Sequence, residues 1–555
     1  MKKKLLFSVI LLAIATLLPK QSKAYDFSAV APSGQTLYYN FQNDGEGVYV
    51  VWPNANAQYY NETWDGYTKP TGDLTIPNSV TYDGQEHPVQ CIWGAFYNCT
   101  ELTSVTIPSS VTLIGNRAFY GCSGLTGSLT IPNSVTSIDE YAFSGDTSIT
   151  SVTIGTSVTS IGGQAFENCH SLTSLTIPAS VTSIGDDAFA YCGSLTSVYY
   201  TGDVAGWCGI ELGNVYSNPL SWAHNLYIND TLVTDLVIPN SVTEIKNFAF
   251  IYASCLTSLT IPTSVTSIGT YAFLACTGLT TLTIPSSVTE IGFCAFASCD
   301  GLTTVNYNAT DCNALTFEQY ERPGEFFSNC EALTTLNIGN NVTKIPDNAF
   351  SYCSSLTSVT SPTSVTSIGD RAFYYCRSLT TVNFNATNCS TMGSSSNPVF
   401  DQCTALATLN IGNNVTIIPS YAFYNLNSLE EIHSHATLAP SLGTDAFFGV
   451  SNTIPVYVPC ECQNAYHSSW TYFSNIIEDC DPQGIDDIAA DKVKIRTLAG
   501  EIIVEGTDAN SKVVVYDLKG CIVHRGRIDG PIHVNAAGVY MVKIDNLQPE
   551  KIVVR

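Results

Sequence analysis

The chain has 555 residues, of which only 12% are charged, and its 47 acidic side chains outweigh 22 basic ones to give a net charge of −25. An acidic surface repels phosphate backbones, and no cluster of Lys and Arg follows the first residues, so the composition argues against nucleic acid as a partner. The chain is also rich in Ser and Thr and contains 20 cysteines, and many of these residues recur at fixed positions of a repeated segment.

Residues 1–24 have the pattern of a secretory signal. Three lysines precede an apolar run from Leu5 to Leu18, and small residues follow at Ser22 and Ala24. The run is shorter than the roughly 20 apolar residues that a membrane span needs, which favours cleavage after Ala24 over a retained anchor. We therefore expect an exported protein at the cell surface or in the medium, with the periplasm as the alternative.

A repeated segment fills the middle of the chain. Residues 25–73, with Trp52 and Trp64, are expected to cap it at the N-terminal side. Aligned on their shared phenylalanine, the copies place Phe96, Phe119, Phe143, Phe166, Phe189, Phe250, Phe273, Phe296, Phe327, Phe350, Phe373, Phe400, Phe423 and Phe447 in one column. Ten of the thirteen intervals are 23 or 24 residues long, and the others, of 61, 31 and 27, contain insertions.

One copy predicts one coil of a solenoid. In the copy that starts at Ser171, Leu175 and Ile177 alternate with polar residues, which predicts a short strand that ends at Pro178. A single coil cannot bury its Leu, Ile, Val and Phe side chains, whereas stacked coils bury them in a continuous column. We predict a repeat solenoid of about fourteen coils over residues 74–450, each with a short parallel strand and a turn or short helix.

The consensus of the copies, LxxLxIPxSVxxIGxxAFxxC, resembles the BspA-like leucine-rich repeat of surface proteins from Bacteroidales and other microbes. The resemblance extends over roughly residues 74–450 and rests on many copies of a specific motif. It implies a leucine-rich-repeat-like stack on a surface protein and indicates architecture better than activity.

Half of the 20 cysteines share one position of the repeat. Ten of them follow the repeat phenylalanine by three residues: Cys99, Cys122, Cys169, Cys192, Cys276, Cys299, Cys330, Cys353, Cys376 and Cys403. Their neighbours are apolar, so we predict buried free thiols rather than a disulfide framework. Cys460, Cys462 and Cys480 lie outside this column and can supply one disulfide, but they lack a fourth ligand for zinc.

The chain carries no recognisable catalytic motif. His433 and His435 stand two apart on a predicted strand, as in a two-ligand metal site. We expect them to lack an acidic or Cys partner and interpret both as surface residues. No HExxH, phosphate-binding loop or nucleophile elbow is present, so neither an enzyme nor a cofactor is expected.

The longest interval contains an insertion at about residues 199–235. It concentrates large side chains, among them Trp207, Trp222 and Tyr227, and predicts a hairpin that turns at Asn229–Asp230. Two interpretations remain open: a structural flap whose aromatic rings cover the core, and a partner site for which these three aromatic residues are the candidates.

A second candidate surface follows one position of the predicted strands. This position holds Thr106, Thr130, Thr153 and Thr176 in the first half of the array, then Asn306, Asn337, Asn383, Asn410 and His433 in the second. The five later residues join the candidates for partner contact because specificity is expected where copies depart from the Ser and Thr consensus.

The array is followed by two further segments. Residues 451–485, with Trp470, are expected to form the C-terminal cap and a linker, and residues 486–555 alternate strands and turns as in a small β-sandwich. The latter segment resembles the C-terminal sorting domain of type IX secretion substrates at Tyr516, Asp517, Gly520, Gly538, Tyr540 and the closing residues Lys551 to Arg555, and it departs from that pattern at Cys521.

These observations favour an exported, non-enzymatic binding or adhesion protein that presents an extended solenoid face to host proteins or glycans. The alternative is a structural or self-associating surface component without a specific host ligand.

Overall fold

The computed structural model describes residues 24–43, 47–314 and 325–480, together with seven strands between Lys494 and Val554. The predicted signal peptide lies outside the described residues except for Ala24. The chain divides into two compact units, Met1–Ile477 and Glu478–Arg555, and each is described by itself. In the described part of the chain, no helix has the length and apolarity that a bilayer span requires.

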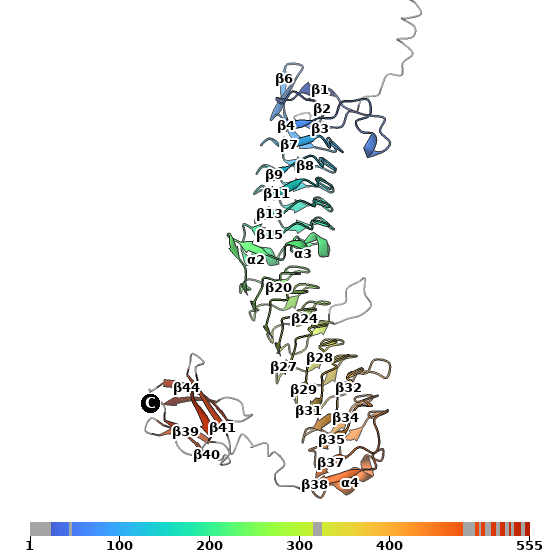
Figure 1. Ribbon diagram of the computed structural model, residues 1–555, viewed down its shortest axis with the longest axis vertical. Coiled ribbons are helices and arrows are strands. Elements are labelled where there is room, and N and C mark those ends of the chain that lie inside the picture. Colours follow the sequence, from blue (N-terminus) through green and yellow to red (C-terminus); the bar gives the residue numbers. More distant parts are fainter. Residues whose placement is uncertain are drawn as a thin grey trace, which may run out of the picture. The chain divides into compact units, whose positions relative to one another are not determined.

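The first unit is a solenoid in which each coil contributes two strands (Figure 1). In one coil these are β13 (Ser174–Ile177), whose side chains alternate between half-buried and buried, and the two-residue β14 (Ser183–Ile184). β13 ends immediately before Pro178, as predicted, because proline has no amide hydrogen for the next ladder bond. The segment that carries the repeat phenylalanine is a series of turns rather than a helix.

The longer strands form parallel sheets along one side of the stack, and the solenoid fold is therefore as predicted. They are β4 (Gly72–Thr75), β7 (Leu102–Thr106), β9 (Gly127–Thr130), β11 (Ile149–Thr153), β13, β15 (Ser197–Tyr200), β17 (Leu226–Ile228), β19 (Asp235–Val237), β21 (Ser258–Thr260), β23 (Thr281–Ile284), β25 (Thr304–Tyr307), β27 (Thr335–Ile338), β29 (Ser358–Ser361), β31 (Thr381–Phe384), β33 (Thr408–Ile411), β35 (Glu431–Ser434) and β37 (Val456–Pro459).

The two-residue strands form a second series of parallel sheets. They are β8 (Leu113–Ile114), β10 (Ser137–Ile138), β12 (Ser160–Ile161), β14, β16 (Glu211–Leu212), β20 (Glu244–Ile245), β22 (Ser267–Ile268), β24 (Glu290–Ile291), β26 (Asn313–Ala314), β28 (Lys344–Ile345), β30 (Ser367–Ile368), β32 (Thr391–Met392), β34 (Ile417–Ile418) and β36 (Ser441–Leu442).

The core is a column of stacked phenylalanines. All the repeat phenylalanines are buried, and neighbours such as Phe166 and Phe189 have ring centroids 5.5 Å apart and an interplanar angle of 1°. The cysteines three residues later are free thiols, as predicted, and most donate an Sγ–H hydrogen bond to the phenylalanine carbonyl of the preceding coil. In one example, Cys192 Sγ lies 3.2 Å from the carbonyl oxygen of Phe166.

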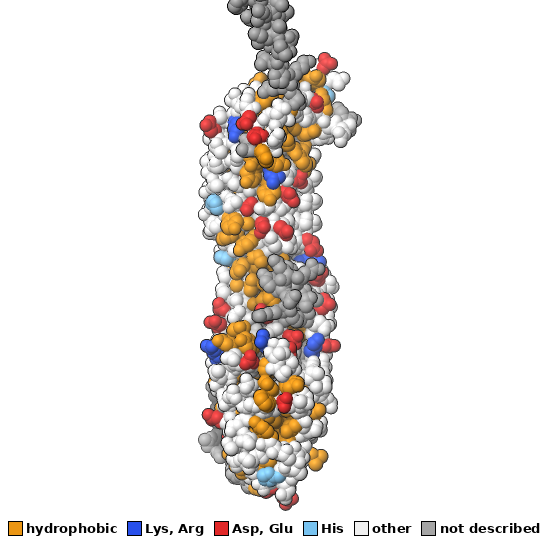
Figure 2. Space-filling model, turned by 90° about the vertical axis from the view of Figure 1, so that its right-hand side faces the viewer, with side chains coloured by type: hydrophobic (Ala, Val, Ile, Leu, Met, Phe, Trp, Pro, Cys, Tyr) orange, Lys and Arg blue, Asp and Glu red, His pale blue; other side chains and the backbone are white. Residues whose placement is uncertain are grey.

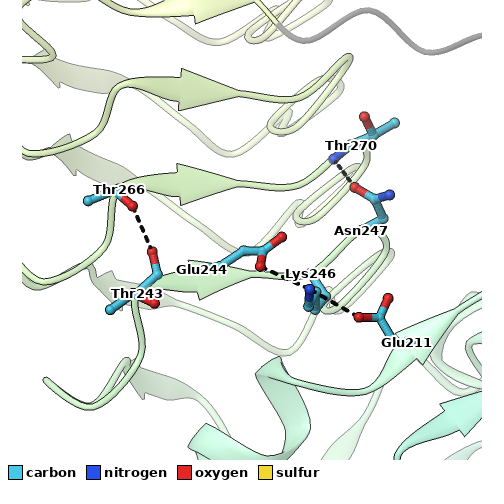
Figure 3. A network of polar contacts seen from close by, with 7 residues as sticks. All are labelled: Glu211, Thr243, Glu244, Lys246, Asn247, Thr266 and Thr270. Atoms are coloured by element: carbon cyan, nitrogen blue, oxygen red, sulfur yellow. Dashed lines mark hydrogen bonds and ion pairs between the residues drawn. The ribbon is translucent and has the colours of Figure 1, made fainter.

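The insertion divides the coils into a first stack, which ends at β16 and the hairpin of β17 and β18 (Thr231–Leu232), and a second stack, which starts at β19 and β20. Three short helices bridge the junction: α2 (Val204–Cys208), η2 (Val215–Ser217) and α3 (Leu220–Ala223). Figure 3 shows Lys246 between Glu211 of β16 and Glu244 of β20, at Nζ–O distances of 3.0 and 2.9 Å. These contacts raise the pKa of Lys246 above its ordinary value.

Each end of the solenoid is covered by a segment that departs from the repeat. At the N-terminal end, the sheet of two-residue strands is extended by β1 (Phe27–Val30), β2 (Thr36–Phe41), β3 (Val48–Val51), β5 (Ser79–Tyr82) and β6 (Gln85–Ile92), and the short helix η1 (Tyr60–Glu62) follows β3 in the chain. At the other end, α4 (Gln463–Ser469) precedes Trp470, whose buried Nε1 donates to the carbonyl of Pro440 over 2.8 Å. Covered ends prevent the open sheet edges from pairing with other chains.

The cysteines beyond the repeat column behave as the sequence predicts. Cys460, beside β37, and Cys480, after β38 (Ile476–Asp479), are both disulfide-bonded. The other seventeen cysteines in the described part of the chain are free, including Cys462.

The second unit contains antiparallel strands in two sheets. One sheet has the order β39 (Lys494–Leu498), β40 (Glu501–Glu505), β43 (Ile532–His533), and the other β42 (Ile522–Arg527), β41 (Lys512–Asp517), β44 (Gly538–Ile544), β45 (Glu550–Val554). Buried residues from both sheets, including Ile502, Val515 and Val542, form its own small core. Cys521 and Gly520 lie outside the described residues.

Candidate partner-binding face

One outward-facing position of the longer strands repeats from coil to coil, and we call the side chains at this position the outward column. Strand register pairs Thr153 with Thr176, Thr176 with Tyr199, and Tyr199 with Tyr227 in the first stack. In the second stack, it pairs Asn306 with Asn337, Asn383 with Asn410, Asn410 with His433, and His433 with Tyr457. The structure thus brings most of the predicted candidate residues onto one face.

The asparagines of the outward column are hydrogen-bonded to one another between coils. Asn337 Nδ2 donates to Asn306 Oδ1 over 2.8 Å, and Asn306 Nδ2 donates to Thr283 Oγ1 over 3.0 Å. The same pattern recurs further along, where Asn410 Nδ2 donates to Asn383 Oδ1 over 2.8 Å. These bonds fix the amide planes at the surface, so the remaining donors and acceptors point in defined directions.

The column ends in a histidine beside an aromatic ring. His433 stacks on Tyr457 with ring centroids 4.7 Å apart, and its Nε2 lies 3.3 Å from Glu431 Oε1. Glu431 also accepts a hydrogen bond from Thr408 Oγ1 over 3.1 Å. The expectation that His433 lacks an acidic partner is therefore wrong, because Glu431 is two residues before it on the same strand and lies beside its ring. Glu431 and Tyr457 hold the ring in place on two sides.

A pocket of about 440 Å³ lies where the insertion meets the outward column. Its lining residues are Thr176, Tyr199, Tyr200, Thr201, Asn229 and Asp230. The predicted hairpin is confirmed, because β17 and β18 are antiparallel and turn at Asn229 and Asp230, both of which have positive φ. This turn carries two polar side chains to the edge of the column.

The rings at the pocket are held rigidly. Tyr199 stacks on Tyr227 with ring centroids 4.8 Å apart and an interplanar angle of 22°. Tyr200 is buried, and burial, with smaller contributions from Asp203 and Cys208, raises the pKa of its phenol. Its hydroxyl therefore stays protonated in neutral solution.

The structure corrects the prediction that Trp207 is a partner anchor. Its side chain is only 3% exposed, and its Nε1 donates to the carbonyl of Ala249 over 2.7 Å. The insertion interrupts the regular backbone hydrogen bonds between coils, and the indole N–H of Trp207 provides a hydrogen bond to this carbonyl. The alternative interpretation, a structural flap that covers the core, describes Trp207 better.

The other two aromatic candidates in the insertion keep some exposed surface. Trp222 is half-buried, packs against the core and stacks on Tyr216 with centroids 5.9 Å apart. Tyr227 is half-buried in the outward column. Only Tyr227 lies next to the pocket, through its contact with Tyr199.

Sequence reasoning missed several residues of this face. Tyr199 and Tyr457 occupy the column position of Thr176, a signal that alignment of the copies would have revealed. Asn229 and Asp230 reach the pocket only through the hairpin fold, which leaves no signal of binding in the sequence. A further pocket, also about 440 Å³, lies on the N-terminal cap and is lined by Trp93 and eight other residues.

Aromatic side chains also gather on a different side of the stack. Figure 2 shows hydrophobic side chains in a broken line along one face of the solenoid. Among the turns that carry the repeat phenylalanines, Tyr97 stacks on Tyr120 at 4.8 Å, and the Arg117 guanidinium lies 4.6 Å from the Tyr60 ring and 4.2 Å from the Tyr141 ring. These contacts join neighbouring turns to one another and, through Tyr60, to η1 of the N-terminal cap.

The repeat pattern decides the family. Six copies of the BspA type leucine rich repeat region match residues 93–207, 223–322, 321–454 and 394–490, which together make up more than half of the chain. The chain belongs to the BspA-type leucine-rich repeat family. In this BspA-type protein, the matched residues include the candidate asparagines and His433 of the outward column, all six residues that line the pocket, and the C-terminal end of the solenoid.

Solved structures of bacterial leucine-rich repeat proteins are similar to this BspA-type chain. A leucine-rich repeat protein from Bacteroides ovatus is 27% identical, with 70% of this chain and 94% of that chain covered and a TM-score of 0.47. A leucine rich cell surface protein from Faecalibacterium prausnitzii is 24% identical, with 82% and 96% covered and a TM-score of 0.33.

A third similar structure is the pneumococcal vaccine antigen PcpA. It is 19% identical to this chain, with 83% of this chain and 99% of that chain covered and a TM-score of 0.31. Among curated proteins, none matches the chain.

Proposed function

We propose that this BspA-type protein is an exported cell-surface or secreted binding protein whose outward column contacts a host protein or glycan. The observation that carries the proposal is the concentration, on one face, of the residues that depart from the Ser and Thr consensus. These are the stacked Tyr199 and Tyr227, the hydrogen-bonded asparagines and His433 on Tyr457. A contact spread over many coils gains affinity from weak interactions, and the rigid aromatic residues provide anchors.

Two features support export as part of this proposal. The predicted signal peptide directs the chain out of the cytoplasm, and disulfide-bonded Cys460 and Cys480 are typical of an oxidising compartment. The antiparallel strands of the second unit are compatible with a type IX sorting domain, which we propose for residues 486–555.

Binding is proposed in preference to catalysis because of where the perturbed groups lie. In the described part of the chain, the largest pKa shifts belong to buried cysteines and to residues such as Asp146 and Tyr307 inside the stack. A catalytic group with a shifted pKa is expected in a cleft that substrate can enter.

The test is a binding screen of the mature chain on extracellular-matrix proteins and on a glycan array, with light scattering to measure its mass in solution. A variant with Thr153→Lys and Asn410→Lys places two charges on the outward column. Its matched control, Ser157→Lys with Asn414→Lys, adds the same charges at exposed turn positions of the same two coils.

We expect the column variant to lose the captured partner and the control variant to retain it. Equal binding by both variants would place the contact elsewhere. Assembly of the chain into larger particles without capture of any partner would support the alternative, a structural or self-associating surface component.

A further inference from the structure

The pocket at the hairpin turn has the composition of a site for a polyhydroxylated ring. Its volume of about 440 Å³ falls within the range of roughly 300–1,000 Å³ that small-molecule sites occupy. It combines an aromatic side chain, Tyr199, with threonine hydroxyls, an amide and a carboxylate. We propose that this pocket binds one neutral sugar unit of a glycan, an inference that rests on the proposed binding function and names its ligand class.

Tyr199 provides a flat surface against which a sugar ring can pack. One side of its ring is covered by Tyr227, whereas the neighbour on the other side is Thr176, whose side chain is much shorter. The step between Tyr199 and Thr176 is part of the pocket. The face of an aromatic ring carries partial negative charge, so it attracts the polarised C–H groups on the apolar face of a pyranose.

The polar groups around this ring can pair with hydroxyl groups. Asp230 offers acceptors, Asn229 offers both donors and acceptors, and neither side chain has a hydrogen-bond partner among the residues that the structure describes. Thr201 Oγ1 accepts from the amide of Ala179 over 3.2 Å and keeps its own hydrogen to donate. A ligand with hydroxyl groups can pair with both the donors and the acceptors of this pocket, because a hydroxyl donates and accepts. A ligand that presents a Lys or Arg side chain can pair only with the acceptors.

The charge of the site selects against acidic ligands. Asp230 is the charged residue in the lining, no Lys or Arg belongs to it, and the chain carries a net charge of −25. A phosphate, sulfate or sialic acid group would therefore be repelled at this position. The expected ligand is a neutral hexose or N-acetylhexosamine unit.

Three variants of the mature chain test this site. Tyr199→Thr installs the residue that Thr153 and Thr176 place at the same column position, so the coil is expected to fold normally. Asp230→Asn keeps the shape of the side chain, and asparagine is well suited to this turn. Asp235→Asn is the matched control, because Asp235 is an exposed acid of the same insertion outside the pocket.

The experiment uses an array of defined neutral, sialylated and sulfated oligosaccharides, followed by saturation-transfer NMR titration of each variant with the neutral oligosaccharides captured. We expect capture of neutral oligosaccharides only, with affinity reduced about tenfold or more in Tyr199→Thr and Asp230→Asn and unchanged in Asp235→Asn. Trp93→Ala, in the cap pocket, is expected to bind as the unaltered chain does.

Each contrary result has a distinct meaning. Loss of sugar binding in Trp93→Ala with retention in Tyr199→Thr would move the site to the cap and overturn the inference. Capture of a protein partner with no sugar captured would also overturn it while leaving the proposed function intact. If neither proteins nor sugars are captured, the proposed function itself fails.

Discussion

The indole of Trp207 and the backbone carbonyl of Ala249 are joined by a hydrogen bond of 2.7 Å between two residues 42 positions apart. The bond links α2 of the insertion to the first phenylalanine turn of the second stack. Asn218 Nδ2 adds bonds to the carbonyls of Phe248 and Ala249, of 2.8 and 3.1 Å. Where the two stacks meet, these side chains add to the backbone bond from the Lys246 amide to the Cys208 carbonyl, which is 3.1 Å long.

Trp207→Phe should destabilise the solenoid by about 1 kcal/mol, because it removes the shorter of two buried hydrogen bonds to the Ala249 carbonyl and leaves only the one from Asn218. Trp222→Phe is the matched control, since the buried Nε1 of Trp222 has no hydrogen-bond partner in the described structure and its removal should cost little. Urea denaturation followed by circular dichroism measures both. Equal destabilisation by the two substitutions would contradict the role given to Trp207.

Phe273→Ala should lower the free energy of unfolding by roughly 3–5 kcal/mol, because it opens a cavity between the stacked rings of Phe250 and Phe296. Phe448→Ala is the control, because that ring is 55% exposed and lies outside the core column. The same urea titration reports both values. A change near zero for Phe273→Ala would refute the coil assignment.

Asp146 interrupts the column of cysteines and should make stability depend on pH. It follows Phe143 by three residues, the position that cysteine holds in most copies, and no described residue places a donor within hydrogen-bond geometry of either carboxyl oxygen. Burial raises the pKa of this carboxyl well above its ordinary value. The folded chain therefore holds a proton that the unfolded chain releases above about pH 4, and stability falls as pH rises from there toward the folded pKa.

Asp146→Cys restores the residue of the neighbouring coils and should remove this loss, which amounts to about 1.4 kcal/mol per pH unit while one proton is taken up on folding. The urea midpoints of the two chains are compared from pH 4 to pH 8. We expect the advantage of Asp146→Cys to grow with pH. Parallel midpoints across this range would show that the carboxyl finds a partner in solution.

The column thiols should resist alkylation in the folded chain. Burial raises the pKa of Cys99, Cys192 and Cys330 to about 12, so almost no thiolate is present at pH 8. Half-buried Cys462 should react first. Mass spectrometry after alkylation without reductant should find Cys460 and Cys480 protected even in denaturant, and disulfides among the column cysteines would contradict the packing described.

Deletion of residues 486–555 in the native host tests the proposed sorting domain. The solenoid has its own core and caps, so it should fold without this segment and accumulate in the periplasm. Cell fractionation with an antibody to the solenoid locates it. Unaltered surface display of the shortened chain would show that export does not depend on the second unit.

The repeat made most of the fold predictable. Because many copies of the repeat have an apolar residue at the same position, their periodicity alone predicts that Phe273 and Cys299 are buried. The register of the strands follows for the same reason, because a slip would place Leu175 of one coil against a polar residue of the next. The sequence does not predict that the thiols donate hydrogen bonds to the phenylalanine carbonyls. These bonds depend on how far each turn is displaced along the solenoid from the turn before it.

The insertion could not be read in this way because it occurs once. Trp207 and Trp222 look alike in the sequence, yet one indole closes the junction between stacks and the other keeps a half-exposed edge. Their difference arises from how α2 and α3 lie against the next coil. The position of Asp230 beside Tyr199 likewise depends on the direction of the hairpin, which no local pattern specifies.

Identical residues face one another across the two-residue strands, with Ile138 beside Ile161 and Ile161 beside Ile184. If one whole coil were removed between equivalent positions, each remaining residue would meet a neighbour of the same kind. The solenoid can therefore be lengthened or shortened in steps of about 4.8 Å without the need for new complementary contacts. Gain or loss of whole repeats would therefore change the length of the solenoid while its cross-section and its column of buried rings stay the same.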